Sequence, residues 1–380
     1  MRDVPGCGCV SEGLGLCAGR RRGSAAAMAL VVLALISVAI GVYVVSTRTA
    51  EDTAELDAKT TRSLGLGDPV ENRLDTRFTD ADRDGVADVP GQTRDPAVLR
   101  LSYLTTDAGV EASAMEPLRA HLAAATGKDV EFVAVVDSKA QLRALALGEL
   151  DVTGFNTGAV PVAVNVAGFV PVAGPVRADG GEGATYKMVV ITPSGSGLSQ
   201  PADLKGRTLA FTRWGSNSGH KAPLVLLRDE FGLVPPTDYS WVFTYSHRNS
   251  MTGVASGALE AAAVASDLLA AAEREGLIKS SDYRVIYESP PFPVAALGYA
   301  HDLDPALAEK VRAALLSFSP EGTPASKAMA GAVSMAPVNY KDDFALVRMI
   351  DNTMGFTHEL PAADTPRQPI ASEPAEPAAE

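Results

Sequence analysis

Short apolar runs alternate with stretches of helical periodicity from residue 99 onward, and this alternation limits the possible fold more than any other feature. Apolar and β-branched runs predict strands at 99–104, 130–136 and 150–153. Between them, leucines recur at helical spacing, and each helical stretch stops at a glycine, Gly127 or Gly148. This β-α-β-α-β order predicts an α/β fold with a parallel sheet covered by helices.

The stretch 203–227 carries the most specific pattern within this order. It begins as a buried strand, turns at Gly215-Ser-Asn-Ser-Gly219 and continues as a helix. Ser216, Asn217 and Ser218 can cap that helix and can also donate hydrogen bonds outward. The free N–H groups and the positive dipole end of a helix start favour an anion. The stretch therefore predicts an anion site, and an ordinary capped turn is the alternative.

Other predicted strands also end in small polar turns. Their side chains are Thr105 and Thr106, Asn156 and Thr157, His247 after a strand at 241–244, and Asp267 after a strand at 260–264. Ligands of open α/β sheets bind beyond the carboxyl ends of the strands, so we expect these side chains to share one crevice. His247 could instead be an exposed turn residue, and Asp267 could only cap the next helix. Ser250 could cap a helix at 251–258.

Composition excludes several classes of protein. The 380 residues are 46% hydrophobic and carry a formal net charge of −13, which argues against a nucleic-acid surface. All three cysteines lie in the first 17 residues, so the folded part has no disulfide and no cysteine metal site. The five histidines show no His-x-x-x-His spacing, which disfavours zinc. We expect about two domains and no cofactor.

The N-terminal region contains an uncharged apolar run at 25–45, long enough to span a bilayer. Three arginines at 20–22 precede it and predict a cytoplasmic tail at 1–24. The rest of the chain would then lie outside the cytoplasm, in the periplasm, held by one span in the inner membrane. A cleaved signal peptide is the alternative.

The region 46–97 is polar and is interpreted as a partly disordered tether. Within it, Asp80, Asp82, Asp84 and Asp88 have the alternate spacing of a calcium loop, with a glycine at the sixth position. Gly91 stands where a bidentate glutamate would complete the site. An acidic, solvated turn is the alternative to calcium binding.

A series of short motifs runs through the second half of this α/β region. They are Asp203-Leu-Lys-Gly-Arg207, Gly215-Ser-Asn-Ser-Gly219, Ser246-His247, Gly257-Ala-Leu-Glu260 leading to Asp267, and Ser289-Pro-Pro-Phe-Pro293, preceded by Gly148-Glu-Leu-Asp151 and Gly154-Phe-Asn-Thr157. Their order and spacing resemble the solute-binding proteins of phosphonate, phosphite and phosphate ABC importers. The resemblance covers about residues 99–318.

The resemblance implies a two-lobed periplasmic-binding-protein type II clamshell, with lobe 1 formed by 98–190 and 286–360 and lobe 2 by 191–285. Residues 216–218 would take the place of the family's hydroxyl donors, and His247 that of its histidine. Asp267 would accept hydrogen bonds from the ligand. A tyrosine that the family often has in the turn at 155–160 is missing, as is an acidic residue after Pro293. Both departures weaken the case for an aminoalkylphosphonate.

These observations predict a non-enzymatic, membrane-tethered solute-binding protein that delivers a small oxyanion to an ABC permease. A tethered ligand sensor on the same fold is the main alternative. A serine hydrolase using Ser216, His247 and Asp267 is less favoured, since the serine lacks a Gly-x-Ser-x-Gly elbow. Towards the C-terminus, helical stretches are expected at 305–318 and at 324–354, the second with a loop near 337–342, and the tail at 361–380 is expected to be disordered.

Overall fold

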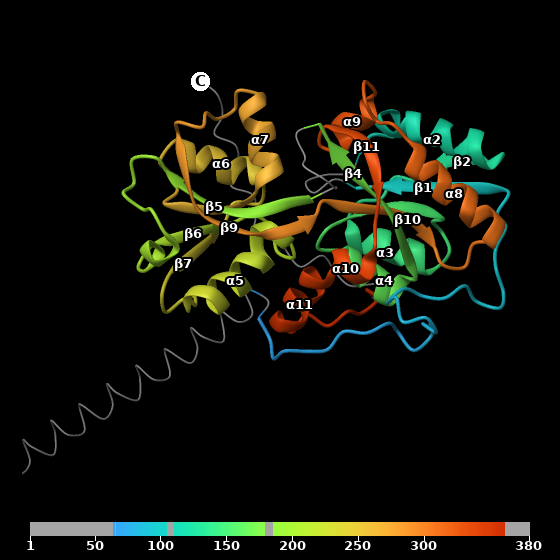
Figure 1. The fold of residues 1–380 in the computed structure, drawn as a ribbon, viewed down its shortest axis with the longest axis horizontal. Coiled ribbons are helices and arrows are strands. Elements are labelled where there is room, and N and C mark those ends of the chain that lie inside the picture. The colour runs from blue at the N-terminus through green and yellow to red at the C-terminus, as the bar shows by residue number, and fades with distance from the viewer. Residues whose placement is uncertain (1–63, 65, 105–109, 179–184, 362–380) are drawn as a thin grey trace, which may run out of the picture. The chain divides into compact units, whose positions relative to one another are not determined.

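The computed structural model of the chain describes residue 64 and residues 66–104, 110–178 and 185–361. Its strands form two sheets, and Figure 1 shows helices on both faces of each. No helix within these ranges is long and apolar enough to cross a membrane. The predicted cytoplasmic tail, the predicted span at 25–45 and all but Pro361 of the predicted C-terminal tail lie outside the described residues.

The first sheet is mixed, with the strand order β11-β4-β10-β3-β1-β2. The strands are β1 (Val98–Tyr103), β2 (Asp129–Phe132), β3 (Val152–Asn156), β4 (Phe169–Arg177), β10 (Ala295–Ala300) and β11 (Ala332–Pro337). β1 pairs in parallel with β2 and β3, as the β-α-β-α-β order predicted. The other three strands pair antiparallel, so the sheet combines a parallel half with an antiparallel half.

Two groups of helices cover the first sheet. The helices are α2 (Ala112–Thr126), α8 (Pro305–Ser317) and α9 (Pro324–Ala328) on one face, and α3 (Ser138–Ala146) and α4 (Val160–Ala167) on the other. Leu118 and Leu122, four positions apart on α2, are fully buried against α8 and the sheet. α2 ends where Gly127 adopts a positive φ of 73°.

The second sheet has the strand order β7-β6-β8-β5-β9. Its strands are β5 (Thr185–Pro193), β6 (Thr208–Phe211), β7 (Ser240–Phe243), β8 (Ala261–Ala265) and β9 (Tyr283–Pro293). The short helix η1 (Pro201–Leu204) precedes β6, and η2 (Asn217–Lys221) leads into α5 (Ala222–Phe231). α6 (His247–Ala255) and α7 (Ser266–Arg274) cover the other face of this sheet (Figure 1).

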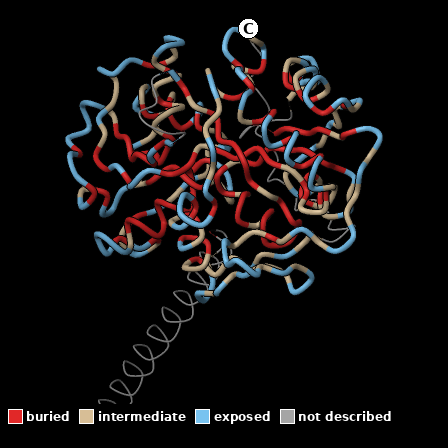
Figure 2. The backbone as a smooth tube through the Cα atoms, turned by 45° about the vertical axis from the view of Figure 1, so that its right-hand side comes forward, coloured by how far each residue is buried: buried red, intermediate tan, exposed pale blue. Residues whose placement is uncertain are grey.

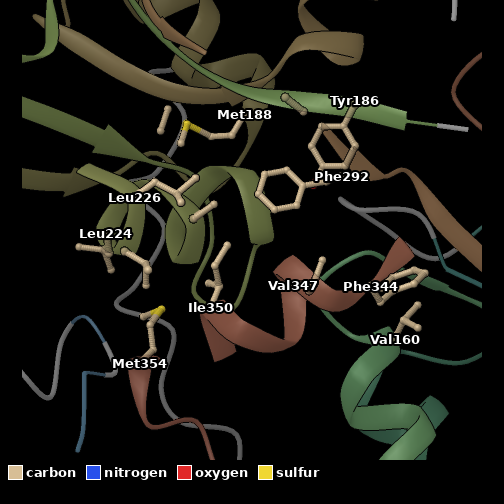
Figure 3. Packing of buried hydrophobic residues seen from close by; sticks show 14 of the residues in the cluster. Val160, Tyr186, Met188, Leu224, Leu226, Phe292, Phe344, Val347, Ile350 and Met354 are labelled. Carbon is tan, nitrogen blue, oxygen red and sulfur yellow. The ribbon is translucent and has the colours of Figure 1, made fainter. Parts of the chain in front are cut away.

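One hydrophobic core joins elements of both sheets to the C-terminal helices α10 (Tyr340–Asp343) and α11 (Ala345–Met354). In Figure 3, Val347 and Ile350 of α11 lie in the same core as Leu226 of α5 and Val160 of α4. Figure 2 shows that the buried residues run through the interior and that the exposed residues lie mainly around the outside. Because α11 contributes to this shared core, it ties α5 of the second sheet to the first.

The structure corrects three expectations about local structure. The region 324–354 is not wholly helical, because β11 runs through it and pairs with β4. α6 begins at His247 and is capped by Ser246, whose side chain accepts from Asn249 N, and Ser250 is buried within the helix. Asp267 lies in the first turn of α7 and is not its N-cap, which is Ala265.

The described part of the predicted tether, residues 66–97, is bonded to the domain and is not a free leash. Gly67 N donates to Met354 O at 2.8 Å, and Asn72 bonds with Asn352 and with the carbonyl of Phe356. Further along, the Arg94 guanidinium pairs with Asp302 and with the buried Asp151. Apart from the Arg94–Asp151 pair, these contacts connect positions more than 200 residues apart, which a polar composition does not reveal.

Candidate functional site

A cavity of about 1200 Å³ lies where the turns after β3, β6 and β8 come together. Seven predicted site residues line it: Asn156, Thr157, Ser216, Asn217, Ser218, His247 and Asp267. The predicted partners Thr105 and Thr106 lie outside the described residues. The turns of both sheets thus contribute to one cavity, as the strand-end argument predicted.

The turn after β6 is shaped by a cap and a close approach. Ser216 Oγ accepts a hydrogen bond from Gly219 N at 3.2 Å. Residues Asn217–Lys221 form a single π-helical turn before α5 begins. A side chain at Gly219 would place its Cβ 2.7 Å from Thr212 Cβ, so only glycine fits beside the end of β6. This packing fixes the positions of Asn217 and Ser218 at the cavity wall.

Asn217 and Thr157 are both held by groups that the sequence did not single out. Asn217 Nδ2 donates to Tyr186 Oη at 3.0 Å, and burial raises the pKa of that tyrosine. The Thr157 hydroxyl lies 2.7 Å from Pro293 O and 2.8 Å from Val294 O, on the segment that joins β9 to β10. Thr157 therefore fixes its own turn to this connection, and its proton is not free for a ligand.

His247 is buried and neutral at physiological pH. Burial, with a smaller contribution from the nearby Arg213 charge, lowers its pKa to about 4. Its Nδ1 accepts a hydrogen bond from Ala265 N at 3.3 Å. The single proton of the neutral ring must therefore sit on Nε2, which becomes a hydrogen-bond donor. The alternative that His247 is an exposed turn residue is wrong.

Asp267 forms a buried ion pair with Arg177, across the cavity from β4 to α7. Arg177 Nε also donates to Ala330 O at 2.8 Å. Arg177 ends the apolar run of β4, where its charge was the only available signal, and sequence reasoning missed it. Since Asp267 Oδ1 has no partner in the described part of the chain, this oxygen can still accept a hydrogen bond.

A second buried ion pair borders the cavity. Lys221 of η2 bonds to Asp351 of α11, and its Nζ also donates to Gly158 O at 3.1 Å. The other oxygen of Asp351 lies 3.4 Å from His358 Nε2. A lysine near a helix start is usually solvated, yet the side chain of Lys221 is only 4% exposed. Each ion pair connects a helix that follows a strand of the second sheet to an element outside that sheet: α7 to β4 in the first pair, and η2 to α11 in the second.

Three polar atoms on cavity-lining residues are buried without a partner among the described residues. They are Thr212 Oγ1, Asn217 Oδ1 and Asp267 Oδ1. An unpaired buried polar group costs about 1–3 kcal/mol, so a ligand or water that supplies hydrogen-bond donors would stabilise them. The carbonyl and carboxylate oxygens among them suit a protonated oxygen or an amine on the ligand.

The model of the family "ABC transporter, phosphonate, periplasmic substrate-binding protein" matches residues 103–344, more than half of the chain. The chain belongs to this family. Members of this phosphonate-binding family are periplasmic substrate-binding proteins of ABC transporters and are generally non-enzymatic, which places the domain outside the cytoplasm. The matched range contains all seven predicted residues that line the cavity. Of the described residues, it leaves out 64, 66–102 and 345–361.

Solved structures show the same fold. A Xanthomonas citri protein bound to ATP has a TM-score of 0.58 at 18% identity, with 68% of this chain and 99% of that chain covered. PhnD1 from Prochlorococcus marinus in complex with methylphosphonate has a TM-score of 0.54 at 16% identity, covering 69% and 99%. A binding protein of a phosphonate transporter from Pseudomonas aeruginosa has a TM-score of 0.51 at 19% identity, covering 64% and 82%.

The acidic loop lies apart from the cavity and outside the range matched by the phosphonate-binding family. Carboxylate oxygens of Asp80, Asp82 and Asp84 lie within 4.8 Å of one another. Asp88 instead accepts from Ala81 N at 2.9 Å through its Oδ2. Burial, and then the neighbouring aspartates, raise the pKa of Asp84. Three of the four predicted calcium ligands, Asp80, Asp82 and Asp84, thus lie close together. The fourth, Asp88, instead bonds to the backbone of the same loop.

Proposed function

We propose that this chain is a membrane-tethered solute-binding protein of an ABC importer that binds a small oxyanion in the cavity described above. The observation that carries the proposal is the convergence of helix N-termini on that cavity. α4, α6 and α7 begin at its wall, and η2 leads into α5 there. Each helix start presents backbone N–H groups and positive potential, which favours an anion stripped of water.

The side chains at these helix starts add neutral donors. Ser218 and the Nε2–H of His247 are the two we assign to the ligand oxygens, and Ser216 and Asn156 lie on neighbouring turns. Asp267 Oδ1 would accept from a protonated ligand oxygen. Arg177 and Lys221 are already paired with aspartates, so the wall offers donors without a large excess of positive charge.

The bonding at the same residues argues against the hydrolase alternative. A catalytic histidine donates from Nδ1 to an aspartate and accepts from serine at Nε2. Here Nδ1 of His247 accepts from Ala265 N, and Asp267 pairs with Arg177. The three residues therefore lack the required tautomer and orientation.

The binding proposal is tested by thermal shift with phosphate, phosphite and methylphosphonate, the ligand of the Prochlorococcus relative. A ligand at about 100 times its Kd should add about 2.7 kcal/mol to the native state. Ser218→Ala combined with His247→Gln should abolish that shift. The matched control, Ser281→Ala with His121→Gln, changes the same residue types outside the cavity and should retain it. Equal binding by the double variant and the parent would place the site elsewhere.

The membrane tether is proposed from the apolar run at 25–45 and the arginines before it. Fractionation followed by a carbonate wash should leave the protein in the inner membrane, with the domain accessible from the periplasm. A mature chain in the soluble fraction whose N-terminus lies beyond Val45 would support the cleaved signal peptide instead.

A further inference from the structure

The cavity is much larger than a simple oxyanion. If each heavy atom takes up as much space as a liquid water, ~30 Å³, a five-atom tetrahedral anion needs roughly 150 Å³. The cavity measures about 1200 Å³, slightly above the range of about 300–1,000 Å³ that holds drug-sized ligands. Phosphate or methylphosphonate would leave most of it to water.

The large volume does not arise because the opposite sides of the cavity stand apart. Arg177 already contacts Asp267 across the cavity, and Lys221 already contacts both Asp351 and Gly158 O. A side chain at Gly158 would place its Cβ 2.8 Å from Gly215 O, so the turns after β3 and β6 touch. The cavity therefore keeps its volume even though the residues on its opposite sides are already in contact.

Two aromatic side chains occupy one part of the cavity wall. Trp214 precedes the polar turn after β6, and Phe356 follows α11, with ring centroids 5.0 Å apart in an edge-to-face arrangement. Trp214 is 57% exposed although an indole ordinarily buries a large area. The indole therefore presents apolar surface that the described residues leave uncovered.

Phe356 of this aromatic pair is held in place by residue Asn72 of the segment 66–97. Asn72 Nδ2 donates to Phe356 O at 2.7 Å, and Asn72 Oδ1 accepts from His358 N at 2.9 Å. Phe356 lies outside the range matched by the phosphonate-binding family, 103–344. The Phe356 part of this wall is thus built by segments that precede and follow the matched range, whereas Trp214 lies within it.

We infer that the ligand is an oxyanion bearing an aromatic or similarly bulky apolar group, which packs against Trp214 and Phe356 while the anion sits at Ser218 and His247. The inference rests on the proposed function and specifies its ligand class. An aromatic substituent would cover the exposed indole and fill space that phosphate leaves to water, both of which favour binding.

Titration calorimetry with phenylphosphonate and methylphosphonate tests this inference on the full chain in detergent. Phenylphosphonate should bind about tenfold more tightly or better, because its ring adds apolar and aromatic contact. Trp214→Ala should reduce phenylphosphonate affinity about tenfold and leave methylphosphonate affinity within about twofold. Trp214→Phe should recover part of the loss. Phe231→Ala, at an exposed aromatic residue outside the cavity, is the control and should bind both ligands like the parent.

The possible failures are distinguishable. Methylphosphonate binding as tightly as phenylphosphonate, or a Trp214→Ala variant that weakens both equally, would overturn the inference and leave the proposed oxyanion site intact. Binding of neither phosphonate nor phosphate would overturn the proposed function itself.

Discussion

Lys221 and Asp351 lie 130 positions apart, yet they form an ion pair in which the side chains are only 4% and 1% exposed. Lys221 belongs to the turn that follows β6, and Asp351 belongs to α11 outside the family's matched range. A charge this deeply buried is tolerated only when it is paired and hydrogen-bonded. The pair therefore fixes the C-terminal helix against the wall of the ligand cavity.

Removing one partner of this pair should destabilise the fold. Asp351→Asn leaves the buried Lys221 ammonium uncompensated and should lower the free energy of unfolding by about 3–5 kcal/mol in urea titrations. Lys221→Met combined with Asp351→Leu should recover much of that loss. Glu275→Gln removes the exposed pair with Arg248 and should cost at most about 1 kcal/mol. A cost for Asp351→Asn no larger than this control would show that the buried pair does not stabilise the fold.

A methyl group at Gly219 should damage the ligand site. Gly219→Ala would place Cβ 2.7 Å from Thr212 Cβ and Cγ2, so η2 must shift away from the end of β6. We expect a loss of about 1–3 kcal/mol in stability and at least a tenfold loss in oxyanion affinity, because Asn217 and Ser218 move with the turn. Gly195→Ala, where no atom lies within 4 Å of the added Cβ, is the control. Unchanged binding by Gly219→Ala would mean that these two residues do not contact the ligand.

Stability should fall with acid because His247 is buried in its neutral form. Its pKa is lowered from the ordinary 6.5 to about 4, so the unfolded chain takes up a proton before the native protein does. The contribution of the neutral ring to the free energy of unfolding is complete above pH 6.5 and is lost as the pH falls towards 4. The total loss is about 3 kcal/mol.

Urea titrations across this pH range should therefore show a shallower decline for His247→Gln than for the parent. The expected difference in slope is at most about 1.4 kcal/mol per pH unit, for one proton. His220, whose pKa burial lowers to about 3, contributes in the same direction and stays present in both proteins. Parallel slopes for parent and variant would contradict the buried neutral assignment of His247.

Calcium should stabilise the domain if the acidic loop binds it. The loop packs on α10, where Lys341 Nζ donates to Arg83 O at 2.9 Å and Gly85 faces the Tyr340 ring. Calcium at about 100 times its Kd should then add about 2.7 kcal/mol to the native state. Asp82→Asn with Asp84→Asn should remove the effect, and Asp68→Asn should not. No calorimetric heat on adding calcium would leave the acidic, solvated turn as the correct interpretation.

The sequence by itself determined the alternation of strands and helices and the positions of the polar turns. These features follow from local periodicity and from glycine and capping residues, each of which acts within a few positions. The parallel pairing of β1 with β2 and β3 follows from the same local order. Because ligands of open α/β sheets bind beyond the carboxyl ends of the strands, the sequence also indicated that the turns at Asn156, Ser216 and His247 would line one cavity, although these turns follow strands of two different sheets.

Only the tertiary structure decided what these turns are bonded to. β4 and β11 pair with strands distant in sequence, and neither has a local signal as strong as that of β6. From the sequence alone, Arg177 and Lys221 look like ordinary solvated charges. In the structure, packing brings Asp267 and Asp351 next to them, and each charge is buried in an ion pair. Whether a charge or a hydroxyl is free for a ligand depends on which groups reach it through space, and that is a property of long-range contacts that no local pattern encodes.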